Sequence, residues 1–313
     1  MWFLWSWVLF GRIIGYKEEV DRLKGDRLRV NSLRGLTLKV IRVFPQRTTV
    51  TPTDELVFVG IGPNMFDEAD AVHVSVSFTW DIPAAEKLAR EWEIVAPVTV
   101  GGPAYNDPGG EFVPGRYVRK GYTITSRGCP NNCWFCKVWQ HEGRTVRELK
   151  INDGWNLLDN NILACSRDHQ TAVYEMLLKQ PEKPRFSGGL EAARFTAWNA
   201  EWLARLKPDY SYFAWDTPDD YEPLENAAGL LRSAGLLRNH KIGCYVLIGY
   251  PYDSFSAAED RLVKTVQLGY FPQAMLFNRG NDREDVKQWR RFQRVWANKV
   301  IVGHKMKQYG RIG

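Results

Sequence analysis

The chain has 313 residues, of which 44% are hydrophobic and 25% are charged, the proportions of an ordinary globular protein. A chain of this length and composition folds as one large domain or two modest ones. An intrinsically disordered chain, a collagen-like fibre and a disulfide-stapled miniprotein are therefore excluded. No apolar run reaches the roughly 18–20 residues that cross a bilayer, so the sequence predicts no membrane span.

The net charge of +6 is spread unevenly along the chain. Residues 1–50 hold ten Lys and Arg against four Asp and Glu, and residues 279–313 hold ten against three, whereas the centre is acidic. Basic ends on an acidic body favour contact with nucleic acid or another anionic partner. Solubilising charge on exposed helices explains the same pattern, and the sequence leaves both interpretations open.

The five cysteines stand at positions 129, 133, 136, 165 and 244, and three of them lie within eight residues. An odd, clustered set argues against the disulfide framework of a secreted protein. We therefore expect a reducing, cytoplasmic setting and a metal site at the three clustered cysteines. Cys165 and Cys244 are too far apart for a second site, and we expect each to be a small buried residue.

Residues 1–36 begin with the apolar stretch MWFLWSWVLFGRIIGYK, which is too short to span a membrane. It lacks the positively charged start and the cleavage site of a signal peptide. We expect residues 1–36 to be a poorly ordered N-terminal extension, with an interfacial membrane anchor as the alternative.

Residues 37–118 are predicted to form a small Rossmann-like α/β domain. Its first strand is expected over 38–44, and residues 72–78 alternate with β-branched side chains as a half-buried strand does. Helical spacing follows over 81–92, and then a strand over 96–100. A segment rich in glycine and proline separates this domain from the rest of the chain.

Residues 119–280 alternate six times between strand and helix, which predicts a parallel sheet. Six units are too few to close an eight-stranded barrel, so we expect an incomplete (β/α)6 barrel. One helix is expected to start with a capping box at Ser256 and Glu259 and to stop at Gly269. The six predicted strands cover residues 122–126, 156–158, 184–187, 211–215, 242–248 and 273–277.

Residues 281–313 form the expected basic and aromatic C-terminal helix and tail. Trp289, Phe292 and Trp296 recur at helical spacing, which predicts a helix that packs its aromatic face on the core and points its arginines outward. Basic residues between aromatic rings are also typical of surfaces that grip single-stranded nucleic acid. This segment is the sequence's one hint about the substrate.

The strongest chemical signal is the run Cys129-Pro-Asn-Asn-Cys133-Trp-Phe-Cys136, just after the first strand of the β/α region. Thiolates select zinc, copper(I) or iron–sulfur clusters, and active sites of parallel β/α folds gather where the strands end. Three closely spaced thiolates bind three irons of a cubane cluster and leave the fourth iron open to an amine and a carboxylate. The alternative is a zinc ion held by the three cysteines and His141.

The stretch from Thr125 to Cys136 resembles the cluster loop of radical S-adenosylmethionine (SAM) enzymes. Locally it is most similar to the branch of methylthiotransferases and cobalamin-dependent enzymes, and the whole chain resembles uncharacterised radical SAM proteins common in phage genomes. The resemblance implies that Cys129, Cys133 and Cys136 bind a 4Fe–4S cluster and that SAM binds its open iron. An electron from a reductant such as flavodoxin or ferredoxin would cleave SAM to a 5′-deoxyadenosyl radical, which abstracts hydrogen from a substrate that the sequence does not identify.

The same resemblance implies cofactor contacts at the other strand ends. Phe135 is expected near the adenine of SAM. Glu191 is expected near its amino group, in a motif that departs from the family's glycine-glycine-glutamate by an inserted leucine. Turns, helix starts and ordinary buried strands explain several of these residues equally well. The expected cofactor-binding set is Phe135, Asp159, Gly188, Gly189, Glu191, Asp216, Ile248, Gly249 and Ala274.

Two motifs that the sequence lacks limit the type of reaction that we expect. Residues 1–118 contain no cysteine, so the second cluster of a methylthiotransferase has no ligands there. The small N-terminal domain also lacks the Asp-x-His-x-x-Gly motif of cobalamin domains, and cobalamin is not expected. Two alternatives stay open: a non-catalytic iron–sulfur protein for electron transfer or structure, and a zinc-stabilised nucleic-acid-binding module.

Overall fold

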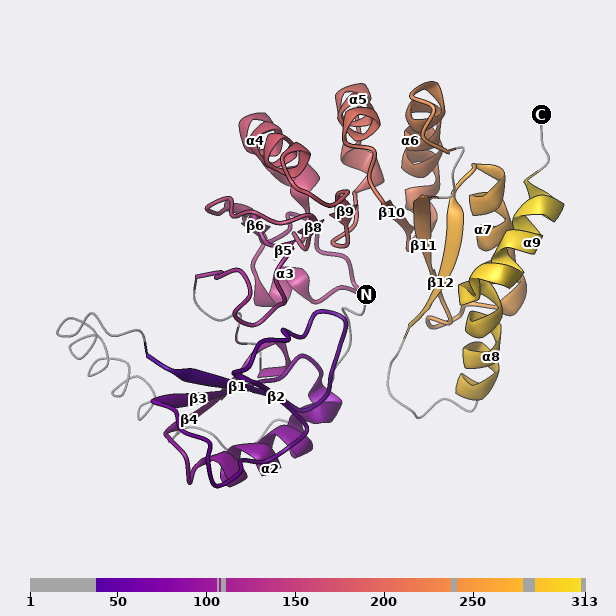
Figure 1. The fold of residues 1–313 in the computed structure, drawn as a ribbon. Helices are drawn as coiled ribbons and strands as arrows, with labels where there is room; N and C mark the ends of the chain where they lie inside the picture. Colours follow the sequence, from indigo (N-terminus) through magenta and orange to yellow (C-terminus); the bar gives the residue numbers. More distant parts are fainter. Residues whose placement is uncertain (1–37, 106, 108–110, 238–240, 278–284, 311–313) are drawn as a thin grey trace. The chain divides into compact units, whose positions relative to one another are not determined.

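The computed structural model describes residues 38–105, 107, 111–237, 241–277 and 285–310 (Figure 1). The N-terminal extension predicted for residues 1–36 lies outside this described part. The described residues divide into two compact units, with the division between residues 109 and 110. No helix in the described part is long and apolar enough to cross a membrane.

The N-terminal unit is a four-stranded parallel sheet with a helix between its last two strands. Its elements are β1 (Val40–Phe44), β2 (Val57–Val59), β3 (Ala71–Ser75), α2 (Ile82–Trp92) and β4 (Val98–Gly101). The strands lie in the order β2-β1-β3-β4. Valines of β1 and β3 form the core with Leu88 and Trp92 of α2, because alternate residues of a strand point to the same face.

Three of these strands and the helix are confirmed predictions, with ends shifted by a few residues. The strand β2 is not predicted by the sequence. It has three residues, all half-buried, and such a short strand shows no resolvable alternation.

The C-terminal unit contains a six-stranded sheet in which all neighbouring strands are parallel. Its strands are β5 (Tyr122–Thr123), β8 (Asn156–Leu157), β9 (Arg185–Phe186), β10 (Tyr210–Trp215), β11 (Ile242–Ile248) and β12 (Phe271–Leu276). Their order across the sheet, β12-β11-β10-β9-β8-β5, follows their order along the chain. All six predicted strands are therefore found, and the predicted α/β class with parallel sheets is confirmed.

Helices connect these strands and lie along an arc on one side of the sheet (Figure 1). They are α4 (Arg167–Leu178), α5 (Ala197–Leu206), α6 (Tyr221–Ser233) and α7 (Phe255–Gln267). Two further helices, α8 (Val286–Ala297) and α9 (Lys299–Tyr309), follow β12 and pack at that end of the unit. Between β5 and β8, β6 (Ser126–Arg127) pairs antiparallel with β7 (Arg147–Glu148), and the short helix α3 (Val138–His141) lies between them in the sequence.

The strand β10 shows how the sheet separates its two faces. Ser211, Phe213 and Trp215 are buried, and the two aromatic side chains belong to the main hydrophobic core with the helices. Tyr210 and Tyr212 alternate with them and are half-buried on the opposite face. The sheet therefore has one face packed against helices and one face that is less tightly covered.

The start of α7 corrects one sequence prediction. The hydroxyl of Ser254 accepts a hydrogen bond from the backbone N–H of Ala257, so Ser254 is the N-cap. The predicted capping box at Ser256 and Glu259 is wrong, because Ser256 already lies inside the first turn. Gly269 follows the helix with a φ of +99°, as a residue that ends a helix does.

The predicted aromatic face of the C-terminal helix is confirmed in α8. Trp289 is 2% exposed and Trp296 is fully buried, and Phe292 packs against the same core. Arg291 and Arg294 lie on the exposed side of the helix. The burial of large aromatic rings fixes α8 against the rest of the unit.

Candidate functional site

Polar and cysteine-bearing loops gather at the carboxyl edge of the six-stranded sheet. Parallel strands all end at one edge, and β/α folds place their ligand sites there. The cysteine loop, defined as residues 128–136, follows β5 and β6. Residues 159–161 follow β8, residues 187–191 follow β9, Asp216 follows β10 and Gly249 follows β11.

Backbone hydrogen bonds hold the cysteine loop in place. The N–H of Gly128 donates to the side-chain oxygen of Asn160 at 3.0 Å, and the N–H of Cys129 donates to the carbonyl of Gly143 at 3.2 Å. Gly128 has a φ of +90°, and a side chain there would collide with the carbonyl of Thr145, so this position requires glycine. The start of the loop is thereby attached to the end of β8.

Asn161 connects the first cysteine with the segment after β9. Its side-chain amide nitrogen lies 3.6 Å from the Sγ atom of Cys129 and donates to Oε2 of Glu191 at 2.5 Å. The same carboxylate oxygen accepts from Nε of Arg194 at 2.8 Å. The side-chain oxygen of Asn161 is buried and has no hydrogen-bond partner in the described part, which leaves one acceptor for a ligand to satisfy.

The three cysteines of the loop share one electrostatic environment. All three are free and half-buried. Burial, together with the smaller effects of the neighbouring Cys136, Cys129, Asp216 and Asp220, raises the pKa of Cys133 to about 11. Burial also raises the pKa of Cys136. The cysteine loop therefore lies near the end of β10, and the thiols of Cys133 and Cys136 favour the protonated form until a bound cation deprotonates them.

The described residues contain no group of three His, Cys, Asp or Glu side chains placed to hold one metal ion. His141, the fourth zinc ligand considered from the sequence, ends α3 with an exposed side chain. A single ion requires all its ligands to meet at one point. A cubane cluster takes one thiolate at each iron, so its three cysteines stand around a larger body. The donor set of three soft thiols fits an iron–sulfur cluster, as it also fits zinc or copper(I).

Trp134 extends the contacts of the cysteine loop to the far end of the sheet. Its ring centre lies 5.9 Å from that of Tyr250, after β11, and 5.2 Å from that of Phe277, after β12. The neighbouring Phe135 contacts Trp134 edge to face at 5.4 Å and is 9% exposed. The loop therefore contacts strand ends from β8 to β12.

Asp159 attaches the end of β5 to the end of β8. One carboxylate oxygen accepts from the N–H of Thr125 at 2.6 Å, and the other accepts from the hydroxyls of Thr125 and Ser126 at 2.6 and 2.7 Å. Burial raises the pKa of Asp159, and these hydrogen bonds oppose that rise. Asp159 is thus placed to position the chain beneath the cysteine loop, while its contact with a cofactor stays a prediction.

The course of the backbone explains why glycine stands at the two positions 188 and 189, after β9. A side chain at Gly188 would collide with the backbone carbonyl of Asp159, so the ends of β8 and β9 approach closely only because this residue is glycine. Gly189 has a φ of +87°. Both glycines shortly precede Glu191 in the chain, and their backbone conformation is explained without a ligand.

Asp216 brings a carboxyl group to the cysteines from the end of β10. Its backbone N–H and that of Thr217 donate to Oδ2 of Asp220 at 2.8 and 2.7 Å, and this starts the following helix. Burial, with the charge of Asp220 as a second cause, raises the pKa of Asp216 to about 8. No described residue donates a hydrogen bond to the Asp216 carboxyl group, so this group is available to a ligand.

Two predicted cofactor residues have buried, apolar side chains. Ile248 is fully buried and Ala274 is 1% exposed, and both side chains belong to the main hydrophobic core. Gly249 has a φ of +69°, and its N–H donates to Oδ2 of Asp253 at 2.8 Å. Contact of Ile248 and Ala274 with a cofactor stays a prediction.

Sequence reasoning misses three contributors to this site. Asn161 was indicated only by its place in the polar run after a predicted strand, and its contact with a sulfur has no sequence signal. Trp134 and Phe277 have none either, since they lie more than a hundred residues apart and meet only through the curvature of the sheet.

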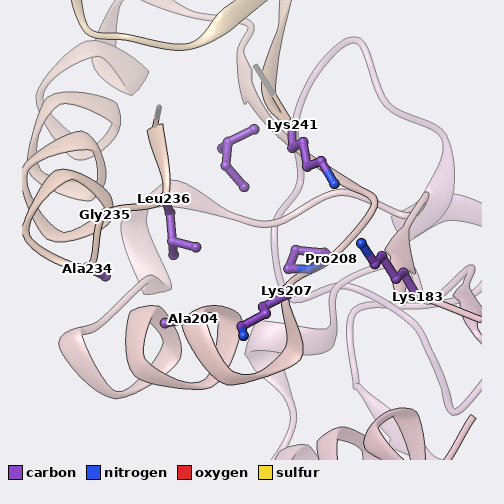
Figure 2. A pocket seen from close by; sticks show the side chains of 9 residues that line it. Lys183, Ala204, Lys207, Pro208, Ala234, Gly235, Leu236 and Lys241 are labelled. Carbon is purple, nitrogen blue, oxygen red and sulfur yellow. The ribbon is translucent and has the colours of Figure 1, made fainter. Parts of the chain in front are cut away.

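A pocket of about 350 Å³ lies at the opposite, amino-terminal edge of the same sheet (Figure 2). Lys183, Lys207 and Lys241, which line it, stand in the segments that lead into β9, β10 and β11. None of the three clustered cysteines and none of the predicted cofactor residues lines this pocket. It is therefore separate from the candidate site.

No protein-family model matches this chain, and no curated protein is significantly similar to it. The interpretation of the site therefore depends on its residues and on their geometry.

Proposed function

We propose that this protein is a radical SAM enzyme in which Cys129, Cys133 and Cys136 hold a 4Fe–4S cluster. When bound, that cluster supplies the electron for reductive cleavage of SAM, and the resulting 5′-deoxyadenosyl radical abstracts hydrogen from a substrate. The cluster and SAM are the only cofactors that we propose, without cobalamin. A flavodoxin or ferredoxin in a reducing cytoplasm is the proposed electron donor, and the free state of all five cysteines fits that setting.

One observation carries this proposal: the cysteine loop contacts the carboxyl ends of strands at both sides of a parallel sheet. Asn161 after β8 reaches the sulfur of Cys129, and Trp134 reaches Phe277 after β12. A ligand held by the cysteines would therefore face the strand ends in between, where Asp216 lies. The loop therefore lies at the edge where β/α folds place their active sites.

The strand order supports the finer architecture. Strands that follow one another in chain order, with helices on one side, build a sheet that curves in one direction, as in a barrel. We therefore interpret the C-terminal unit as an incomplete (β/α)6 barrel and the N-terminal unit as a small Rossmann-like domain.

The chain's own residues have distinct tasks in this proposal. The Asn161 amide donates to a cysteine sulfur, and hydrogen bonds to sulfur tune the reduction potential of a cluster. Asp159 holds the chain below the loop, and the buried Phe135 limits the access of water to the cysteines, which protects a radical reaction. Asp216 offers a carboxyl group to the amino or hydroxyl group of a ligand.

The decisive experiment is an anaerobic assay for 5′-deoxyadenosine. The full chain is reconstituted with iron and sulfide, mixed with dithionite and SAM, and the product is measured by mass spectrometry. The test variant is Cys133→Ala, and the matched control is Cys244→Ala, which removes a cysteine buried in the core instead. We expect product from the wild type and from Cys244→Ala, and none from Cys133→Ala.

Other outcomes point to the two alternatives. An intact cluster whose spin-resonance signal is unchanged by SAM, without product, would support a non-catalytic iron–sulfur protein. Zinc without iron or sulfide in the purified protein would support a zinc-stabilised module. Equal product from wild type and Cys133→Ala would contradict the assignment of the three cysteines.

A further inference from the structure

Helix α8 has two faces of opposite character. One face packs Trp289 and Trp296 into the core of the C-terminal unit. The opposite side of the helix is exposed to solvent. It carries Lys287, Arg291 and Arg294, which together are named the basic face.

The basic face has no acidic counterpart on its own elements. Neither α8 nor α9 contains an Asp or Glu, whereas every other described α-helix that carries Lys or Arg also carries Asp or Glu. Within the part of the chain that the structure describes, Lys287, Arg291 and Arg294 form no ion pair. In α7, by contrast, Lys264 pairs with Asp260 at 2.8 Å.

Charge of one sign on successive turns is unfavourable for a helix. Lys287 and Arg291 stand four residues apart, with Arg294 on the following turn, and like charges four residues apart repel each other. Solubility alone is served by mixed charges, as α7 shows. The basic face therefore keeps a repulsion that a bound polyanion would relieve.

We propose that the basic face binds the phosphate backbone of double-stranded nucleic acid. A duplex presents a dense and regular row of negative charges, and guanidinium groups match phosphate oxygens with two parallel hydrogen bonds. Side chains one turn apart on a helix are separated by about 5–6 Å at Cβ, so a short row of them reaches neighbouring phosphates. This binding does not depend on the proposed radical chemistry.

Burial of the aromatic face distinguishes a duplex from two other anionic partners. A helix that binds a membrane inserts its apolar face among the lipids, but Trp289 and Trp296 already lie in the core. Single strands are held by bases that stack on exposed aromatic rings, and these rings are not accessible for stacking. The single-strand interpretation of this segment is therefore replaced by contact with duplex phosphates.

The experiment measures binding of the full chain to a fluorescein-labelled duplex of about 20 base pairs by anisotropy, from about 50 to about 300 mM potassium chloride. The test variant is Lys287→Gln/Arg291→Gln/Arg294→Gln. The matched control, Lys179→Gln/Lys183→Gln/Lys207→Gln, removes three exposed charges of the same unit elsewhere. Circular dichroism melting verifies that both variants fold.

We expect the test variant to bind at least about ten-fold more weakly at about 100 mM salt, with a salt slope reduced by about three, since each lost phosphate contact lowers it by about one. The control should bind within about two-fold of the wild type. A charge-preserving Arg291→Lys/Arg294→Lys variant should retain most of the affinity, because phosphate attraction is largely electrostatic.

Three results would overturn the proposal. One is equal weakening in the test and control variants, which would indicate general charge attraction. Another is tighter binding to the single strand of the same sequence than to the duplex. The third is binding to anionic phosphatidylglycerol vesicles, lost in the test variant, without binding to the duplex.

Discussion

The side-chain amide of Asn161 lies 3.6 Å from the sulfur of Cys129 and joins the end of β8 to the cysteine loop. Asn161 is 5% exposed, so this contact is shielded from water. The same amide donates to Glu191 at 2.5 Å. A single buried side chain thus links Cys129 and Glu191, which lie 62 residues apart in the chain.

Replacing Asn161 by leucine removes the hydrogen bond to sulfur while keeping the approximate volume of the side chain. We expect the reconstituted cluster to have a lower reduction potential, because a donor to sulfur stabilises the more negative reduced state. A redox titration followed by spin resonance measures it. In the control, Asn160→Ala removes the acceptor of the Gly128 N–H. The Asn160→Ala variant should retain less iron after reconstitution, but the reduction potential of its remaining cluster should be unchanged. A potential that is unaltered in Asn161→Leu would contradict the assigned contact.

Asp216 should make the stability of the cluster-free protein fall as the pH rises. Its pKa is about 8 in the folded protein, above the value of about 3.9 for an unfolded aspartate. The folded state therefore binds a proton that the unfolded state releases between about pH 4 and pH 8, and stability is lost across this range.

The Asp216→Asn variant lacks this proton uptake, so its stability relative to the wild type should increase from pH 5 to pH 7.5. The slope is at most about 1.4 kcal/mol per pH unit. Urea unfolding at several pH values measures the difference. A difference that is constant with pH would show that Asp216 is ionised in the folded protein.

The Gly188→Ala substitution should destabilise the protein because the added methyl group meets the backbone carbonyl of Asp159. Backbone cannot rotate away as a side chain does, and overpacking of this kind costs about 1–3 kcal/mol. Gly229→Ala is the matched control, since nothing lies within 4 Å of its added methyl group. In the helix α6 this control should stabilise by about 0.5–1 kcal/mol. Thermal or urea unfolding of both variants tests the contrast, and equal effects would rule out the predicted collision.

Ser254 and Ser256 allow a direct test of where α7 begins. Ser254→Ala removes the acceptor of the Ala257 N–H and should destabilise the protein by about 1 kcal/mol. Ser256→Ala replaces a residue inside the first turn and should have little effect or stabilise slightly, because alanine has the higher helix propensity. Urea unfolding curves compare the two, and a larger loss for Ser256→Ala would restore the capping box predicted from the sequence.

The sequence by itself determined the succession of elements and the position of the three clustered cysteines. Strands such as β11 and helices such as α8 follow from local patterns, because alternation and helical spacing are properties of neighbouring residues. The burial of Trp289 and Trp296 also follows from a local pattern, because these residues recur at helical spacing. The sequence did not determine short elements or the exact starts of helices. The strand β2 has too few residues to show a pattern. At α7, both Ser254 and Ser256 are residue types that cap a helix, and the sequence does not distinguish them.

Only the tertiary structure decided which side chains meet. The approach of Asn161 to Cys129, and of Trp134 to Phe277, depends on how far each strand end extends and how the sheet curves. The same applies to the assignment of Ile248 and Ala274 to the core rather than to the polar edge. Gly188 is explained by the close approach of two strand ends. Contacts of this type join residues distant in the chain, and no local pattern of the sequence records them.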